Sequence, residues 1–399
     1  MRRSPLVIVY LTVFVDLLGF GIILPLLPFY AEKFGATGVW VGALLTAYSA
    51  AQIVGAAFLG RLSDRIGRRP ILLISLLGST LSLTLTGFAS SLAVLLAGRA
   101  LAGLFGGSIG TAQAYIADLT KPEERAKYMG LLGASIGMGF VLGPGIGGFL
   151  APFGFGTAAF VAAALCGANL LFALLRLPES RRPDSPRRAR ALLTPGSLVK
   201  ALQQPSVGRI LSATFLVTFA FVGMEATAAL FGQHRFGLTS ETLGYGFALI
   251  GVVIAIVQGG LIGRLVKRHG ERTIAAVGGT LMGVALLAIP FIPSLLLAGA
   301  VGALLGVGQG LASPTLSTLL SREAGADEQG GTLGMGQSLS ALARAVGPIV
   351  AGSLFDLGEG WPFYLGAVLS IVAAWQIAQY VVLPRDSANA ASAESVAGR

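Results

Sequence analysis

The chain has 399 residues, of which 54% are hydrophobic and only 12% are charged, and its mean hydropathy is +0.79. An ordinary soluble protein carries about 25% charged residues, so this composition excludes a water-soluble globular protein, and the scarcity of charge also excludes a disordered one. The formal net charge of +10 would indicate a nucleic-acid-binding protein only if the basic residues gathered on a soluble domain. The single cysteine, Cys166, excludes an internal disulfide and a cysteine-based metal site.

Apolar segments long enough to cross a bilayer, about 20 residues each, follow one another along the chain. They lack the alternation of apolar and polar residues that is typical of a membrane barrel, so we predict an all-α membrane protein with twelve transmembrane helices. The predicted helices cover about residues 5–31, 39–60, 70–90, 92–118, 126–151, 157–176, 207–233, 242–265, 273–293, 295–321, 330–354 and 360–384. The first is too long for a signal peptide and contains Asp16, so we keep it as the first membrane helix.

Between the sixth and seventh helices the composition changes sharply. Residues 179–205 are polar, basic and rich in proline, which is typical of a solvated linker. We therefore expect an N-terminal six-helix bundle over 1–178, a cytoplasmic linker over 179–205, a C-terminal six-helix bundle over 206–385 and a cytoplasmic tail over 386–399.

The two halves also resemble each other in sequence. The stretch GRLSDRIGRR at 60–69 recurs as GRLVKRHGER at 263–272, which is 203 positions later. Glycines and a Gly-Pro pair recur at almost the same spacing: Gly103 and Gly107 as Gly306 and Gly310, and Gly143-Pro144 as Gly347-Pro348. This repetition indicates a duplicated, pseudo-symmetric six-helix unit, which is found in one class of secondary transporters.

The basic residues predict the orientation in the membrane. Of the 28 Lys and Arg residues, 24 fall on the side of the N-terminus and only Lys33 and Arg235 on the opposite side. The positive-inside rule therefore places both termini in the cytoplasm of a multi-pass cell-membrane protein. The net charge of +10 marks the cytoplasmic face, and no soluble domain remains to bind nucleic acid.

Two glycine-rich motifs suit close helix packing. The loop between the second and third helices runs from Gly60 to Pro70, and its Asp64 carboxylate suits the positive N-terminal end of a neighbouring helix. In the fifth helix Gly139, Gly143 and Gly147 form a smooth stripe at i, i+4 and i+8 that lets another helix approach closely. Pro144 removes one backbone hydrogen bond and permits a kink there.

Ionisable residues inside membrane helices are expensive and mark functional sites by default. Asp16 lies ~16 Å along the first helix, and Arg99 lies ~20 Å from the cytoplasmic surface if the core is about 30 Å thick. These depths suit a pair, which either takes part in proton coupling or only locks helices 1 and 4 together. Glu225 in the seventh helix is either a proton or cation site or a packing carboxylate, and Arg344 in the eleventh either leaves it free or holds it ionised.

Together these motifs resemble the major facilitator superfamily, in particular its twelve-helix drug–proton antiporter branch that includes the tetracycline-resistance exporters. The resemblance covers residues 5–384 and rests on the 60–70 loop, on the helix 5 glycine pattern from Gly130 to Gly148 and on the Asp16 to Pro28 pattern of helix 1. It implies that Asp64 latches onto helix 11 in one state, with Arg68 and Asp118 as an associated charge relay. The gating or conformational residues that it implies are Gly60, Asp64, Arg65, Gly67, Arg68, Asp118, Gly139, Gly143, Pro144 and Gly147.

The resemblance also implies where protons and substrate bind. Proton-coupling residues are expected at Asp16, Arg99, Glu225 and Arg344. Helices 1, 4, 7 and 10 line the cavity in this fold, which favours as substrate contacts Asp16, Gln113, Tyr115, Glu225 and Gln309. The amides and the tyrosine are open to a second interpretation, which is hydrogen bonding between helices.

We therefore predict a secondary active transporter, not an enzyme, that exports small amphipathic or drug-like molecules in exchange for protons by alternating access. The sequence has no nucleotide-binding loop, so we expect no cofactor and no metal, with a proton gradient as the energy source. The expected partners are a small-molecule substrate, H⁺ and the lipid bilayer, and we expect a functional monomer. The alternatives are a proton symporter or uniporter for a metabolite and a non-transporting membrane scaffold or sensor.

Tetracycline itself is disfavoured as a substrate. The tetracycline exporters that the chain resembles carry additional acids in helices 3 and 9. The corresponding segments here, 70–90 and 273–293, contain no ionisable residue.

Overall fold

The computed structural model describes residues 4–180, 195–323 and 329–379, and every regular element in these ranges is helical. The N-terminal half contains α1 (Ser4–Ile23), α2 (Leu27–Glu32), α3 (Gly38–Ile66), α4 (Arg68–Gly87), α5 (Leu92–Phe105), α6 (Ser108–Leu119), α7 (Pro122–Leu150), a 3₁₀ turn (Ala151–Phe153) and α8 (Phe155–Arg176). The C-terminal half contains α9 (Pro195–Gln203), α10 (Pro205–Phe236), α11 (Ser240–Ile256), a π-helical turn (Val257–Leu261), α12 (Ile262–Ala288), a 3₁₀ turn (Ile289–Phe291), α13 (Leu295–Glu323), α14 (Gln329–Leu357) and α15 (Trp361–Ala378).

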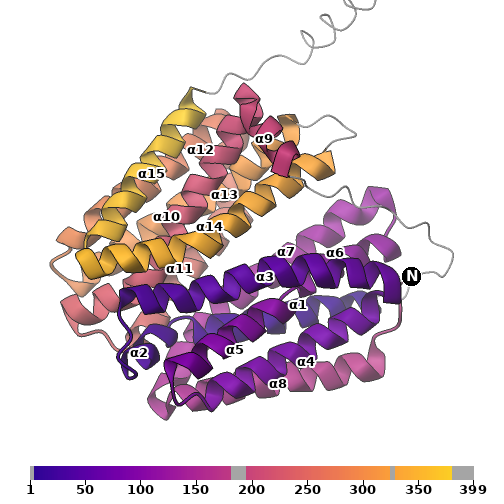
Figure 1. Ribbon diagram of the computed structural model, residues 1–399. Coiled ribbons are helices and arrows are strands. Elements are labelled where there is room, and N and C mark those ends of the chain that lie inside the picture. The colour runs from indigo at the N-terminus through magenta and orange to yellow at the C-terminus, as the bar shows by residue number, and fades with distance from the viewer. Residues whose placement is uncertain (1–3, 181–194, 324–328, 380–399) are drawn as a thin grey trace, which may run out of the picture.

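The long helices gather into two groups that follow the two halves of the sequence. In Figure 1 the helices before α9 form the lower group, in indigo to magenta, and those from α9 onward form the upper group, in red to yellow. The groups meet where α3 packs along α14 and where α7 packs along α11. All backbone polar groups must be satisfied internally in lipid, and helices do this within one segment, so an all-helical bundle is the expected fold.

Eleven segments of the described residues are long and apolar enough to cross a membrane. One of them, Ser240–Phe291, has 52 residues, which corresponds to ~78 Å of helix and more than twice the roughly 30 Å core of a bilayer. Gly270, with φ 77° and ψ 156°, breaks this segment between the two predicted helices 242–265 and 273–293. Divided at Gly270, the segment supplies two of the twelve predicted crossings.

Two predicted helices are interrupted. The first is divided into α1 and α2 around Pro25, because proline lacks the N–H that would continue the helix. The fourth is divided into α5 and α6 at Gly106 and Gly107, although Leu92–Leu119 is still one apolar segment of membrane-spanning length.

The predicted linker differs from expectation at its C-terminal end. Residues 195–203 form α9, which packs against α10 and buries Ala201. Pro195 is suited to the first turn of a helix, and the apolar residues that follow give α9 a face to bury. Residues 181–194 of the linker and the tail at 386–399 lie outside the described residues.

The predicted glycine stripe of helix 5 is the surface on which α1 packs. A Cβ added at Gly143 would lie 2.7 Å from the Cα of Gly21, and one added at Gly139 would lie 2.7 Å from the Cβ of Leu17. Real Cβ atoms essentially never make contacts this short, so α1 and α7 approach too closely at these positions for either glycine to carry a side chain.

Gly143→Ala is expected to destabilise the protein by about 1–3 kcal/mol, because the added methyl group would push α1 away from α7. Gly137→Ala is the matched control, since Gly137 lies on the same helix and a Cβ there meets nothing within 4 Å. Both variants gain the same helix propensity. Thermal unfolding of the purified proteins in detergent measures the difference, and equal melting temperatures would contradict the packing described.

Candidate functional site

Asp16 lies in α1, where its two carboxylate oxygens have different hydroxyl partners. Ser79 of α4 donates to Oδ1 at 2.8 Å, and Ser108 of α6 donates to Oδ2 at 2.6 Å. Both serines are buried. The carboxylate therefore has a hydrogen bond on each oxygen, and both bonds come from neutral groups.

Arg99 of α5 is only 1% exposed, and its guanidinium carbon lies 5.7 Å from the ring centre of Tyr48. Its Nε and Nη1 atoms have no hydrogen-bond partner. The predicted pair of Asp16 with Arg99 is wrong, because no ion pair joins them within the described residues and each side chain faces other neighbours. Depth along a helix fixes the height of a residue in the membrane but not the direction in which it points.

Tyr48 of α3 connects the ionisable residues of the two halves. Its hydroxyl accepts a hydrogen bond of 3.3 Å from Gln52, and its ring packs 4.7 Å from the ring of Phe20. It lies near Asp16 and Arg99 of its own half and near Arg344 of α14. Tyr48 belongs to none of the sequence motifs, and its central place comes from the packing of α1, α3, α5 and α14.

Glu225 of α10 and Arg344 of α14 are electrostatic neighbours. They do not form an ion pair within 4.0 Å among the residues that the structure describes. Glu225 therefore has a cation nearby but no ion-pair partner within the described residues. Each half thus holds one deep carboxyl group, Asp16 or Glu225, and one deep arginine, Arg99 or Arg344.

The three other predicted substrate contacts differ in exposure. Gln113 of α6 is exposed, and Gln309 of α13 has a buried Oε1 with no hydrogen-bond partner. Tyr115 is fully buried and donates a hydrogen bond of 2.8 Å to the carbonyl oxygen of Pro178, so its prediction as a substrate contact is wrong for this conformation. Residues two positions apart on a helix are separated by roughly 200°, so Gln113 and Tyr115 face opposite sides of α6.

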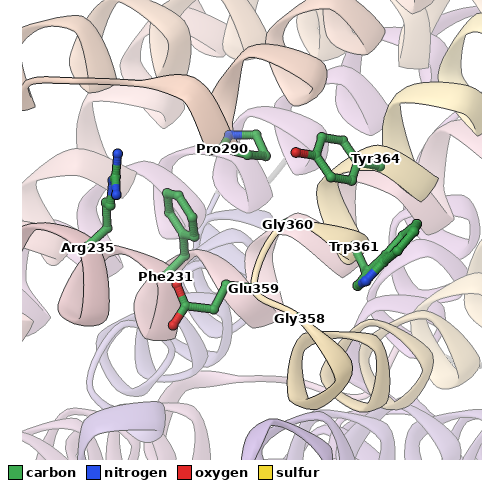
Figure 2. A pocket seen from close by; sticks show the side chains of 8 residues that line it. All are labelled: Phe231, Arg235, Pro290, Gly358, Glu359, Gly360, Trp361 and Tyr364. Carbon is green, nitrogen blue, oxygen red and sulfur yellow. The ribbon is translucent and has the colours of Figure 1, made fainter.

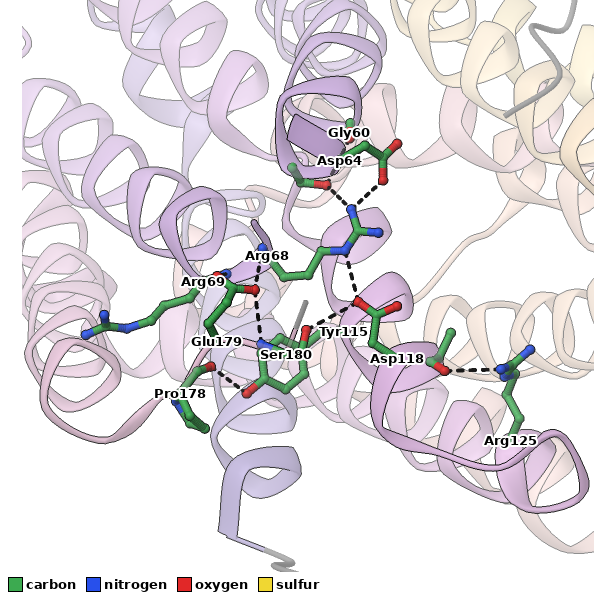
Figure 3. Close-up of polar contacts among 12 residues, drawn as sticks. Gly60, Asp64, Arg68, Arg69, Tyr115, Asp118, Arg125, Pro178, Glu179 and Ser180 are labelled. Atoms are coloured by element: carbon green, nitrogen blue, oxygen red, sulfur yellow. Dashed lines mark hydrogen bonds and ion pairs between the residues drawn. The ribbon is translucent and has the colours of Figure 1, made fainter. Parts of the chain in front are cut away.

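The predicted contact between Arg68 and Asp118 is present at the end of the bundle where α3 ends, which we call the Arg68 end (Figure 3). Arg68 Nη1 lies 2.5 Å from Asp64 Oδ1 and its Nε lies 3.2 Å from Asp118 Oδ2. Ser180 also donates to Asp118, at 3.3 Å. Asp64 therefore pairs within its own half, and within the described residues no hydrogen bond or ion pair joins it to α14.

Glu179 belongs to the same cluster, although the sequence analysis assigned it to a solvated linker. Its carboxylate accepts the backbone N–H groups of Arg68 at 2.9 Å and Arg69 at 3.1 Å, in the first turn of α4 (Figure 3). An acid in this position satisfies free N–H groups and complements the helix dipole. Gly67 makes the approach possible, because its φ is 106° and an added Cβ would lie 2.5 Å from Glu179 Oε2.

The C-terminal half has a charge-reversed counterpart of the Arg68–Asp118 pair. Glu271 stands 203 positions after Arg68, and it pairs at 2.5 Å with Arg322, which stands 204 positions after Asp118. Both halves therefore have an ion pair at equivalent positions, but the acidic and the basic residue have exchanged positions between the halves. Composition and motif spacing gave no indication of this pair, because each partner alone looks like a loop charge.

The opposite end of the bundle, where α3 begins and α14 ends, joins the two halves; we call it the Asp356 end. Asp356 of α14 accepts the backbone N–H groups of Gly38 at 2.6 Å and Val39 at 2.9 Å, at the start of α3. His234 of α10 lies 2.9 Å from Glu359 and 3.5 Å from Glu32 of α2. These residues lie at helix ends or in short loops and match no sequence motif, so the sequence alone did not indicate them.

A pocket of about 250 Å³ lies near the Asp356 end in the C-terminal half (Figure 2). It is lined by Phe231, Arg235, Pro290, Gly358, Glu359, Gly360, Trp361 and Tyr364. None of the predicted coupling or substrate residues lines it. Glu359, which lines this pocket, also lies 2.9 Å from His234.

Comparison with known proteins identifies the family. The sequence model of the Major Facilitator Superfamily matches residues 9–348 and 259–398. The chain belongs to this superfamily of membrane transporters. It is therefore a multi-pass transporter and not an enzyme, as the sequence predicted.

Individual relatives extend over nearly the whole chain. The chain is 32% identical to the tetracycline resistance protein class C of Escherichia coli over 380 residues, 93% of this chain and 95% of that protein. It is 29% identical to multidrug resistance protein 2 of Bacillus subtilis over 93% of this chain and 94% of that protein. The crystal structure of the human organic anion transporter MFSD10 matches with a TM-score of 0.70 and 28% identity, over 94% of this chain and 99% of that one.

Tyr115→Phe is expected to lower the free energy of unfolding by about 1 kcal/mol, because it removes a hydrogen bond to a part-buried carbonyl group. Tyr245→Phe is the matched control, since the Tyr245 hydroxyl is exposed and lies 3.5 Å from Glu241. Thermal unfolding compares the two variants. Native stability of Tyr115→Phe together with weakened ligand binding would restore Tyr115 as a substrate contact.

Proposed function

We propose that this protein exports small amphipathic or drug-like molecules across the plasma membrane in exchange for protons. The observation that carries the proposal is one deep carboxyl group in each half, Asp16 in α1 and Glu225 in α10. Asp16 accepts hydrogen bonds from Ser79 and Ser108, and Glu225 lies near Arg344 without an ion pair between them in the described residues. Relatives named for tetracycline and multidrug resistance support a drug-like substrate.

Exchange follows if a proton and the substrate compete for the same charge. A proton that enters from outside neutralises Asp16 or Glu225, which removes the attraction for a cationic or polarised substrate. Release of that proton inside restores the carboxylate, which binds the next substrate molecule. Two ligands that exclude each other in this way have a negative coupling free energy, and that coupling is reciprocal. Gln113 and Gln309 supply neutral hydrogen bonds to the substrate in this proposal.

Alternating access explains the different contacts at the two ends. The halves are joined at the Asp356 end, and at the Arg68 end Asp64 pairs within its own half. Because the basic loops lie at the Arg68 end, the positive-inside rule assigns it, and both termini, to the cytoplasm. The described conformation then corresponds to one closed to the outside. In the opposite state the Asp356 contacts break and Asp64 reaches the start of α14.

Transport by the purified protein in vesicles tests the proposal. With an acidic interior, vesicles holding the native protein are expected to accumulate ethidium, an amphipathic cation, while an internal pH dye reports the protons that leave. Asp16→Asn and Glu225→Gln are each expected to remove the part of ethidium accumulation that the pH gradient drives. Glu124→Gln, at an exposed carboxyl group at the start of α7, is the control and should transport like the native protein.

The competing functions give different outcomes in the same vesicles, with tetracycline and other small molecules added to the panel. Accumulation that ignores the pH gradient would indicate a uniporter, and protons that move in the same direction as the substrate would indicate a symporter. Binding without flux for every compound would indicate a scaffold or sensor. Each of these results would overturn proton-coupled export.

Asp356→Asn is expected to shift the population toward the outward-open state by on the order of fivefold, because a charged acceptor at a helix start contributes about 1 kcal/mol. Spin labels at Phe88→Cys and Leu296→Cys, with Cys166→Ser, would report the separation of the halves at this end. Ser353→Ala is the matched control, because the Ser353 hydroxyl bonds only to Ile349 of its own helix. An unchanged distance distribution in Asp356→Asn would contradict a latch here.

A further inference from the structure

The break between α5 and α6 lies beside Asp16. α5 ends at Phe105 and α6 begins at Ser108, with Gly106 and Gly107 between them. A broken helix inside a membrane frees backbone groups that lipid cannot satisfy. Gln52 of α3 meets this need, because its Nε2 donates a hydrogen bond of 3.2 Å to the carbonyl oxygen of Gly106. The break is therefore a supported element of the structure.

The break brings the first residue of α6 to Asp16. The Oγ of Ser108 lies 2.6 Å from Asp16 Oδ2, so the carboxylate lies close to the start of α6. The start of a helix carries a partial positive charge, which favours an anion. Ser79, from a different helix, donates to the other carboxylate oxygen at 2.8 Å. An uninterrupted helix would have no free N-terminal end at this depth.

The two donors are buried, with Ser79 6% and Ser108 1% exposed, and Asp16 itself is half-buried. The titratable groups near Asp16 on neighbouring helices are Tyr48 of α3 and Cys166 of α8. The residues of α7 that approach the main chain of α1 around Asp16 include Gly139 and Gly143, which carry no titratable group. No cation lies within ion-pair distance of Asp16 in the described part of the chain. Stabilisation of the carboxylate therefore depends on the hydroxyl groups and the start of α6.

We propose that Ser79 and Ser108 are positioning residues that set the pH at which Asp16 binds its proton. Hydrogen bonds donated to a carboxylate favour its charged form over its neutral form. The serines thus keep Asp16 able to release a proton in a region of low dielectric, without the permanent partner that an arginine would be. A fixed cation would hold the carboxylate ionised through the whole cycle. This inference rests on the proposed role of Asp16 in proton exchange.

The test is a pH titration of the purified protein, followed by infrared absorption of the protonated carboxyl C=O group. The Asp16 band is assigned by its loss in Asp16→Asn. Ser79→Ala and Ser108→Ala are each expected to move the titration midpoint of this band upward by about one pH unit, because a hydrogen bond to a charged group contributes about that much. Ser108→Thr keeps the hydroxyl and is expected to restore the native midpoint.

Ser75→Ala is the matched control. Ser75 lies one turn before Ser79 on α4, it is buried, and its hydroxyl has no hydrogen-bond partner. A native midpoint in Ser75→Ala with shifted midpoints in the other two variants supports the proposal. Unshifted midpoints in Ser79→Ala and Ser108→Ala would overturn it, and so would an equal shift in Ser75→Ala.

The titration of Asp16 can be interpreted even if one serine variant does not fold or if no substrate is known. If Ser108→Ala does not fold, the midpoint of Ser79→Ala alone decides between the two outcomes, since Ser79 acts on the other carboxylate oxygen. The titration uses no substrate, so it is independent of whether ethidium is carried. A shifted midpoint without any transport would contradict the proposed function and leave the positioning of Asp16 supported.

Discussion

The free-energy cost of holding charge inside a bilayer governs this structure, and each buried charge is accommodated differently. Asp16 receives two hydroxyl hydrogen bonds, Arg99 lies over the ring of Tyr48, and Arg344 is set against both Tyr48 and Glu225. Such costs amount to several kcal/mol per group. A proton that changes one of these charges therefore shifts the balance among tightly packed helices. That sensitivity is what a coupling site requires.

Carboxylates at helix starts recur at both ends of the bundle with different consequences. Glu179 satisfies the first N–H groups of α4 within one half, so its bonds can persist while the halves move. Asp356 satisfies the same kind of groups at the start of α3, but across the two halves. Its bonds must break when that end opens. One physical interaction thus stabilises a half in the first case and a conformation in the second.

The sequence predicted the helices and the glycine stripe, because these depend on composition or on spacing along one segment, and the family resemblance implied the Arg68–Asp118 contact. It failed for Asp16 with Arg99, where the depths agree but the side chains point elsewhere, and for Tyr115, where helical periodicity separates it from Gln113. Glu179 and Asp356 were missed because their partners are backbone N–H groups, which every residue carries. Such contacts leave no signal in residue type, and only the packing of the helices reveals them.

The contacts between the halves have a consequence for the speed of motion. Gly42 of α3 lies against the main chain of Pro348 in α14, and Gly148 of α7 lies against Gly244 of α11 in the same manner. Surfaces that carry no long side chains have no interlocking rotamers to rearrange when one helix moves across the other. Friction along such a surface is low, so the barrier between conformations is concentrated in the few polar bonds at the bundle ends. In a transporter built this way, the polar contacts at the two ends of the bundle set the rate of conformational exchange.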